Sequence, residues 1–148
     1  MLKEVYAVDA VALVPESGTF AMEAVTRQFG FVAYGGSAQW FFFLPCSQIF
    51  EVVAKITVDQ PYVVFALHVE TSFGMILPDY YIKADTDAVQ AHGRLFVLNC
   101  IASGRVWVDI RAAGVGVLIS APQKGWSASP YAGMVMMTEA GMGAVKVN

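Results

Sequence analysis

Leu118-Ile-Ser-Ala-Pro-Gln-Lys-Gly-Trp126 is the stretch that decides the fold. The apolar residues at its start predict a buried strand, which ends at Ser-Ala-Pro because proline lacks the N–H that a central strand must donate. A single lysine, Lys124, follows immediately. Open α/β sheets bind ligands beyond the carboxyl ends of their strands. Lys124 is therefore a candidate nucleophile, although an isolated loop lysine is more often simply solvent-exposed.

Strands and helices alternate on both sides of this stretch. Apolar runs predict strands over residues 10–14, 31–34, 62–67, 95–98, 115–119 and 132–137. Helical spacing, caps and stop signals predict helices over 17–30, 46–58 and 78–91. The last strand follows too short a loop for a crossover helix, so it should pair antiparallel. The pattern predicts an α/β protein with three αβα layers and a mostly parallel sheet, in which residues 1–148 form one domain.

Composition narrows the class of protein. The chain has 148 residues, of which 57% are hydrophobic and 14% charged, against roughly 25% charged in ordinary soluble domains. This indicates strands buried on both faces, or a surface that faces a partner. A net charge of −3 and the lack of a basic block argue against a nucleic-acid partner.

Neither a membrane nor an oxidising compartment is indicated. The most apolar run, Phe41–Leu44, ends at Pro45 and is far shorter than the roughly 20 residues of a membrane span. Glu4 and Asp9 interrupt any apolar segment of a signal peptide. Cys46 and Cys100 are the only cysteines, too few for a disulfide framework. We therefore expect a cytoplasmic protein with no membrane contact.

Four segments in a fixed order carry a family resemblance. They are Pro15-Glu-Ser-Gly-Thr-Phe-Ala-Met-Glu23, His68-Val-Glu-Thr-Ser-Phe-Gly74, Leu95-Phe-Val-Leu-Asn-Cys-Ile-Ala-Ser-Gly104 with Val106-Trp-Val-Asp109, and Leu118–Trp126 with Ala132–Met137. The chain resembles the class V family of pyridoxal-phosphate-dependent aminotransferases, of the alanine–glyoxylate and serine–pyruvate type. The match covers most of residues 8–138, with a poorly matched stretch at 30–56. It implies part of a fold-type I large domain, pyridoxal 5'-phosphate as cofactor, and a homodimer.

The resemblance implies amino-group transfer from alanine or serine to a 2-oxo acid such as glyoxylate or pyruvate. Lys124 would hold the cofactor through its aldehyde and then move the substrate's α-proton. Ser17, Gly18 and Thr19 would bind the phosphate at a helix N-terminus, where the dipole favours an anion. Gln123 would be a second phosphate contact. On its own, Ser-Gly-Thr could equally be an ordinary helix cap.

Further family positions fall on the cofactor ring. Thr71, with Ser72 as the substitute, would reach the ring hydroxyl, although both also suit a turn before a glycine. Ile101 would pack under the ring, although an apolar residue there also suits a plain core. Trp40 or Phe41 is the nearest match to the aromatic residue that stacks on the ring.

Asn99 departs from the family, which has an aspartate paired with the pyridine nitrogen. A carboxylate keeps that nitrogen protonated so that the ring acts as an electron sink, whereas asparagine brings no charge. The family's small domain, which contributes an arginine for the substrate carboxylate, and its N-terminal segment lie outside these residues. We therefore expect little or no transaminase activity from this chain alone. A catalytically inactive binding or assembly module stays open as an alternative, as does a pyridoxal-phosphate-dependent lyase.

Other chemistries fit less well. Ser120 and Lys124 lack the Ser-x-x-Lys spacing of a serine hydrolase. The pair of histidines, with Glu70 and Cys100, lacks a metal-ligand spacing, so no metal is expected. His68 is instead predicted to be a hydrogen-bonded core histidine. The glycine-containing residues 139–148 are expected to fray.

Overall fold

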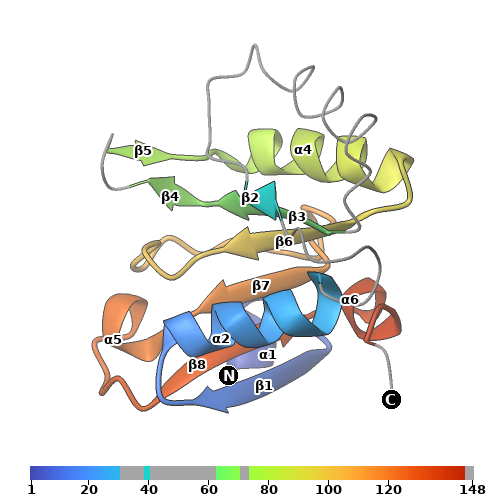
Figure 1. The fold of residues 1–148 in the computed structure, drawn as a ribbon. Coiled ribbons are helices and arrows are strands. Elements are labelled where there is room, and N and C mark those ends of the chain that lie inside the picture. Colours follow the sequence, from blue (N-terminus) through green and yellow to red (C-terminus); the bar gives the residue numbers. More distant parts are fainter. Residues whose placement is uncertain (31–38, 41–62, 71–73, 146–148) are drawn as a thin grey trace.

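The computed structural model describes residues 1–30, 39–40, 63–70 and 74–145 (Figure 1). Its helical elements are α1 (Leu2–Val5), α2 (Gly18–Val25), the π-helical turn η1 (Thr26–Gly30), α4 (Asp79–Ala91), α5 (Pro122–Gly125) and α6 (Glu139–Gly143). Its strands are β1 (Ala10–Pro15), β2 (Gln39–Trp40), β3 (Val63–Leu67), β4 (Val69–Glu70), β5 (Met75–Ile76), β6 (Leu95–Asn99), β7 (Val117–Ser120) and β8 (Ala132–Met137). The predicted strand at 31–34, the predicted helix at 46–58 and the apolar run at 41–44 lie outside the described residues.

One mixed sheet forms the centre of the molecule. Its strand order is β1-β8-β7-β6-β3-β2, and a separate hairpin pairs β4 with β5. The strands β2, β3, β6 and β7 pair in parallel, whereas β8 is antiparallel to both β7 and β1. The predicted antiparallel last strand is thus confirmed, because the short loop at 126–131 turns the chain straight back into the sheet.

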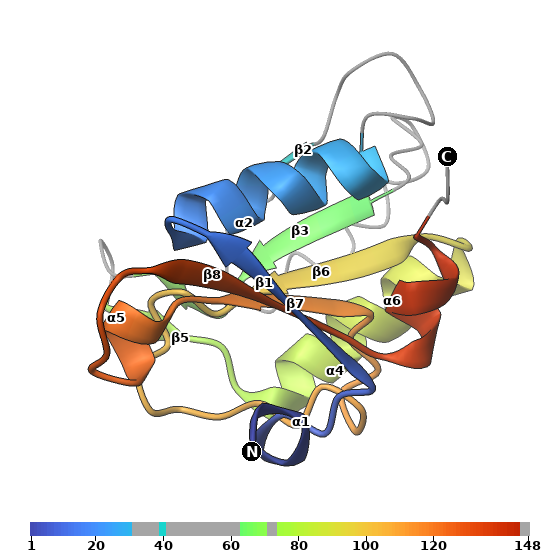
Figure 2. The same cartoon turned by 90° about the horizontal axis from the view of Figure 1, so that it is seen from below.

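Helices cover both faces of this sheet, which confirms the predicted three layers (Figure 2). On one face, α2 buries Ala21 and Val25 against residues of β3, β6, β7 and β8. On the other, α4 buries Ile82 and Val89 against Phe96 and its neighbours. Because both faces are covered, β6 and β7 are buried along their whole length. This explains their unbroken apolar sequences.

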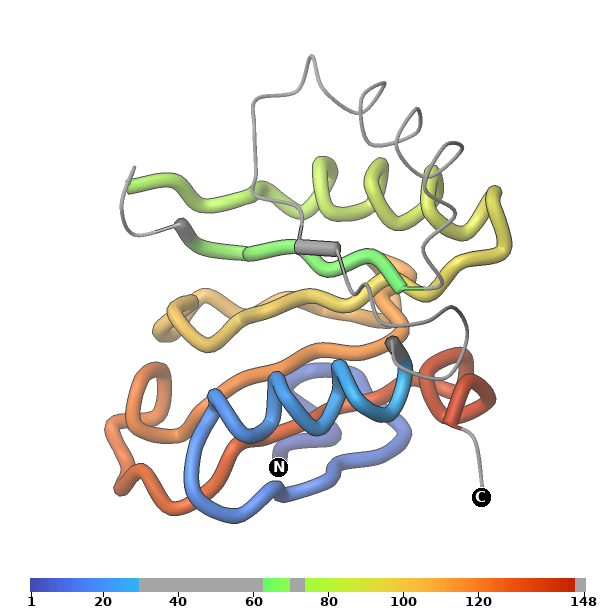
Figure 3. The backbone as a smooth tube through the Cα atoms, in the orientation of Figure 1, coloured from blue at the N-terminus to red at the C-terminus, as the bar shows by residue number. Residues whose placement is uncertain are grey.

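The first and last strands are neighbours in space. β1 pairs along its length with β8, from Ala10 opposite Met137 to Pro15 opposite Ala132 (Figure 3). Among the described strands, β1 has no partner on its other side and forms an edge of the sheet. Leu13 on this strand is exposed.

The C-terminal region departs from the sequence-based expectation. We expected fraying from residue 139, but residues 139–143 form α6. Gly141 is buried against the carbonyl of Gly116, where a Cβ atom would collide. The Glu139 N–H donates to Asp9 Oδ2 at 3.0 Å. The prediction was wrong because these tertiary contacts involve residues far away in the sequence. In the part of the chain that is described, no helix has the length and apolar character to cross a membrane.

Candidate functional site at the carboxyl edge of the sheet

The carboxyl ends of β1, β3, β6 and β7 meet at one edge of the sheet, because these strands share one direction. The segments that leave this edge are the start of α2, the residue His68, the loop after Asn99, and α5 with Lys124. Figures 1 and 2 show α5 and the beginning of α2 at the same end of the molecule. Lys124 therefore lies where the sequence analysis placed it, and its side chain is exposed.

The junction between β1 and α2 has a strained backbone. Glu16 has φ +87°, a left-handed conformation that side chains disfavour and that clusters at functional sites. Ser17 is the N-cap residue, but its side chain makes no capping hydrogen bond. Ala21 donates the first N–H bond of the helix, to the Ser17 carbonyl at 3.1 Å. The preceding N–H groups, of residues 18–20, have no partner within the helix, as at any helix N-terminus.

Gly18 brings three segments into contact. A Cβ on Gly18 would lie 2.9 Å from Ile101 Cδ1 and 3.1 Å from Ala121 Cβ. The first residue of α2 thus packs directly on the loop after β6 and on the residue that precedes α5. Three of the predicted site segments, those of Gly18, Ile101 and Lys124, are held together by this contact.

Asn99 ends β6 on the face covered by α2, and it is 8% exposed. Its Oδ1 accepts a hydrogen bond from the Ile101 N–H at 3.0 Å, which fixes the turn after the strand. Its Nδ2 donates to Met22 Sδ at 3.0 Å. Both polar groups of the side chain are therefore engaged, and the second bond requires an N–H donor, which an amide has and an ionised carboxylate lacks.

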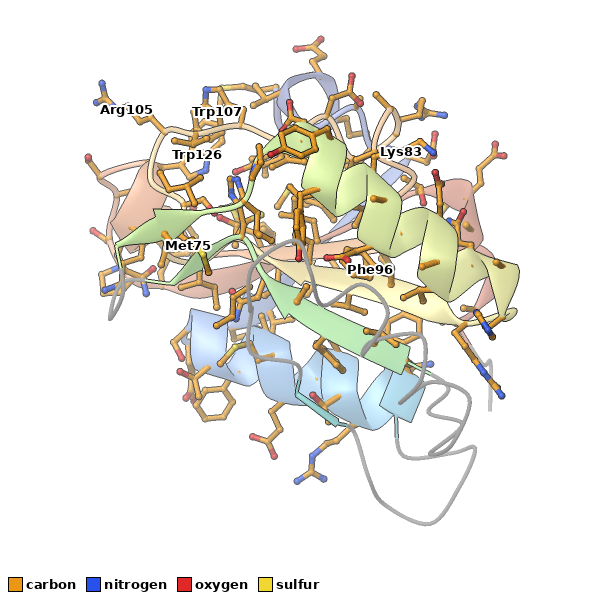
Figure 4. All side chains as sticks on the ribbon, turned by 90° about the horizontal axis from the view of Figure 1, so that it is seen from above. Met75, Lys83, Phe96, Arg105, Trp107 and Trp126 are labelled. Carbon is orange, nitrogen blue, oxygen red and sulfur yellow. The ribbon has the colours of Figure 1, made fainter. Side chains whose placement is uncertain are left out.

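α5 is a single turn that starts with Pro122 as its first residue. Lys124 and the half-buried Gln123 lie on this turn. Gln123 Oε1 is buried and has no hydrogen-bond partner among the described residues. Gly125 packs against the carbonyl of Gly104 so closely that a Cβ would collide. Trp126 follows, with its ring centroid 4.8 Å from that of Trp107 (Figure 4).

Several predicted site residues cannot be placed in the same way. Thr71, Ser72 and Phe41 lie outside the described residues. Trp40 lies in β2, of which only the backbone is described. Thr19 is in the first turn of α2 and is exposed. Cofactor-binding and catalytic roles for these residues, and for those brought together at the edge, stay predictions.

A buried polar cluster on the opposite face of the same edge was only partly predicted. His68 is a hydrogen-bonded core histidine, as expected, and its Nδ1 lies 2.7 Å from Ser103 Oγ. Ser103 itself was not singled out, because a serine between alanine and glycine looks like ordinary turn sequence. Burial lowers the pKa of His68, which the nearby Asp79 carboxylate and the Leu77 backbone partly offset. The ring is therefore held neutral.

Cys100 belongs to this cluster and is not a nucleophile. Burial raises the pKa of its thiol to about 12, although a hydrogen bond with Ser103 acts in the opposite direction. Burial also raises the pKa of Tyr6, against the effect of Ser120 and Trp126. Within the described ranges, no three His, Cys, Asp or Glu side chains are grouped so that they could hold a metal ion.

Comparison with known proteins identifies the fold. No model of a known protein family matches the sequence, and no curated protein matches it. Among solved structures, alanine–glyoxylate aminotransferase from Nostoc sp. has a TM-score of 0.75 and 21% identity, over 97% of this chain and 44% of that one. Ureidoglycine–glyoxylate aminotransferase from Bacillus subtilis has a TM-score of 0.76 and 19% identity, over 97% and 43%.

A third relative, an aspartate aminotransferase of subgroup IV from Thermus thermophilus, has a TM-score of 0.73 and 20% identity, over 99% of this chain and 48% of that one. The resemblance drawn from the sequence motifs is thereby confirmed at the level of the fold. The chain spans less than half the length of each of these three relatives.

Proposed function

We propose that this chain binds pyridoxal 5'-phosphate at the carboxyl edge of its sheet and contributes the lysine of a class V transaminase site. The implied reaction moves an amino group from a small amino acid, alanine or serine, to a 2-oxo acid such as glyoxylate or pyruvate. The observation that carries the proposal is that Gly18 packs on Ile101 and Ala121. On an aminotransferase-type fold, this contact brings the three motif segments to one edge. We further propose a cytoplasmic homodimer.

The residues at this edge fit the cofactor's phosphate. The N–H groups at the start of α2 have no partner within the helix, and the Ser17 side chain makes no capping hydrogen bond. The helix dipole adds a partial positive charge there. Gln123 carries a buried amide oxygen without a partner, and an amide can turn over so that its NH₂ group faces an anion. These groups together supply donors, as a phosphate requires.

The remaining residues define what the site can do. Bound pyridoxal phosphate supplies an electron sink for the substrate's α-carbon. Lys124 would hold the cofactor through its amine and, once that amine is released, would accept and return the substrate's α-proton. Ile101 supplies an apolar surface next to Gly18. Asn99 can donate a hydrogen bond but brings no charge to hold a proton on the ring nitrogen, so we expect cofactor binding with little turnover.

One observation favours a second function, that of a catalytically inactive binding or assembly module. Asn99 does more than lack a charge, because its amide donates a hydrogen bond to Met22 Sδ that an ionised carboxylate could not donate. A site rebuilt around an amide in this way is compatible with a protein whose chemistry has been lost. The two functions differ in whether Lys124 reacts with the cofactor.

Borohydride trapping tests the proposal. The protein is mixed with pyridoxal phosphate, its near-ultraviolet to blue absorbance is recorded, and the reduced adduct is located by peptide mass spectrometry. We expect one dominant adduct on Lys124, lost in Lys124→Ala and kept in the control Lys83→Ala, whose lysine is exposed on α4 (Figure 4). A colourless protein, or adducts spread over all lysines, would favour the inactive module.

Turnover is measured separately with alanine and glyoxylate. We expect a rate close to that of free pyridoxal phosphate. Sustained turnover abolished by Lys124→Ala would show that this chain is sufficient for catalysis.

A further inference from the structure

The hydrogen bond between His68 and Ser103 joins two loops that leave neighbouring strands. His68 follows β3 and is 1% exposed, and Ser103 lies in the loop after β6 and is 6% exposed. Their side chains are 2.7 Å apart, between His68 Nδ1 and Ser103 Oγ. Loss of either partner would leave a buried polar group unsatisfied, which is costly. The bond therefore fixes the loop after β6 with respect to β3.

Ser103 lies at the centre of a compact turn. Its N–H donates to the Cys100 carbonyl at 3.1 Å, and its own carbonyl accepts from the Val106 N–H at 3.1 Å. The next residue, Gly104, adopts φ +61°, which glycine tolerates. Both backbone groups and the side chain of Ser103 are thus committed, so a displacement of this serine would displace the whole turn.

This turn is the surface on which α5 rests. The Gly104 carbonyl faces Gly125 without room for a Cβ between them. Farther along the same loop, Trp107 packs on Trp126, with ring centroids 4.8 Å apart (Figure 4). Gly125, the last residue of α5, and Trp126, its C-cap, follow Lys124 directly. Both are therefore held by the loop that contains Ser103.

α5 cannot set its own geometry. It is four residues long, and within it the Lys124 N–H bonds the Ala121 carbonyl at 3.3 Å and the Trp126 N–H bonds the Pro122 carbonyl at 3.1 Å. A single helical turn is not stable alone, because nucleation fixes several residues for very few hydrogen bonds. The position of Lys124 must come from the contacts around it.

We propose that His68 is a positioning residue for Lys124, acting through Ser103 and the contact between Gly104 and Gly125. The chemical meaning of this inference rests on the proposed function, in which Lys124 is the reacting amine. The coupling between His68 and Lys124 does not require the cofactor, so it is tested first on cofactor-free protein. The lowered pKa of His68 agrees with this role, because a neutral ring nitrogen can accept a hydrogen bond from the Ser103 hydroxyl.

Two substitutions of His68 separate the hydrogen bond from the loss of the ring. The amide of His68→Asn occupies the place of Nδ1 and can still bond Ser103, whereas the amide of His68→Gln reaches the place of the far ring nitrogen and leaves Ser103 without its partner. Ser103→Ala removes the same bond from the other side with little change in volume. Val89 lies in the core near the C-terminal end of α4, so Val89→Ala is the control for a general loss of stability.

Backbone amide hydrogen exchange is measured on the cofactor-free variants, with global stability followed by thermal unfolding. We expect faster exchange at 103–106 and 122–128, by about tenfold or more, in His68→Gln and Ser103→Ala. His68→Asn should restore the slow exchange, and Val89→Ala should leave these segments no faster than the rest of the molecule. Unchanged exchange at 122–128 in both Ser103→Ala and His68→Gln would overturn the proposal.

Borohydride trapping on the same variants separates this inference from the proposed function. If wild type forms the Lys124 adduct, His68→Gln and Ser103→Ala should lower its yield at limiting cofactor, by about tenfold or more, while His68→Asn retains it. Equal yields in all variants would overturn the positioning role. If wild type forms no adduct, the proposed function fails, and the exchange rates alone decide whether His68 positions α5.

Discussion

Asn99 is the residue on which the chemistry of the proposed site depends. It ends β6 beside α2, with its amide shared between Met22 and the backbone of Ile101. The Ile101 N–H would satisfy one oxygen of a carboxylate at this position. The Met22 sulfur would not satisfy the other oxygen, because a thioether sulfur and a carboxylate oxygen are both hydrogen-bond acceptors. A single substitution can therefore place a carboxylate here at the cost of one hydrogen bond.

Asn99→Asp should raise the rate of the first half-reaction in protein loaded with pyridoxal phosphate. A carboxylate would keep the ring nitrogen protonated, and a preorganised charge of this kind is worth on the order of a hundredfold. The measurement is the single-turnover change in absorbance with excess alanine. Asn99→Ser, which brings no charge, is the matched control. An equal rate in both variants would show that the missing charge is not what limits the site.

Asp85 is a second residue with a clear electrostatic consequence. It is 4% exposed on α4, and within the described part of the chain its buried Oδ1 has no hydrogen-bond partner. Burial raises its pKa to about 7, above the roughly 3.9 of an unfolded chain. The folded state therefore keeps the proton that the unfolded state loses, so this group's contribution to stability falls as the pH rises from about 4 to 7.

Asp85→Asn should consequently stabilise the protein above pH 7 and change little near pH 4. The gain at pH 8 should be on the order of 2–4 kcal/mol, since one pKa unit corresponds to about 1.4 kcal/mol. Thermal unfolding at the two pH values measures it. The exposed Asp87→Asn is the control and should shift stability by less than about 1 kcal/mol at either pH. A gain that is equal at pH 4 and pH 8 would contradict the assignment.

At the scale of elements, α5 depends on a contact between two backbones. Gly125→Ala would place a methyl group against the Gly104 carbonyl, so the turn must shift. We expect a loss of about 1–3 kcal/mol in the free energy of unfolding, typical of overpacking, together with a lower yield of the Lys124 adduct. Gly143→Ala is the control, because a Cβ there meets nothing within 4 Å. Chemical denaturation that shows equal stability for both variants would exclude the contact.

The elements that were predicted correctly are those whose signals are local. α4 follows from the Pro78-Asp79 start signal and the glycine after it, and β3, β6 and β7 follow from continuous apolar runs. α6 was missed because its stability comes from Gly141 on Gly116 and from Asp9, neither of which is a neighbour in sequence. The site could be predicted only in part for the same reason. The motif residues could be named, but the Ser103 contact with His68 exists only once β3 and β6 are paired.

At the scale of the whole molecule, Asp9 connects three separate parts of the chain. Its Oδ1 pairs with Arg111 at 2.6 Å, and its Oδ2 accepts from the Glu139 N–H. Arg111 belongs to the turn before β7, and Glu139 begins α6. These interactions lower the pKa of Asp9, the hydrogen bond from Arg111 having the largest effect.

The stability that Asp9 contributes should therefore depend on pH in the opposite sense to that of Asp85. Because the folded pKa is lowered, the contribution is present above the unfolded pKa, roughly 3.9, and is lost as the pH falls through the folded value. Asp9→Asn should lower the melting temperature at pH 7, and the difference from wild type should shrink towards pH 3. Glu16→Gln, away from these contacts, serves as the control. A difference that grows on acidification would contradict this reading.

The pairing of β1 with β8 has a consequence for how the protein is made. More than a hundred residues separate the two strands along the chain, and such distant contacts slow folding because a long loop must close first. On the ribosome, β1 emerges before β8 and waits for its partner until residues 132–137 have been synthesised. During that interval its apolar edge is open to pairing with other nascent chains.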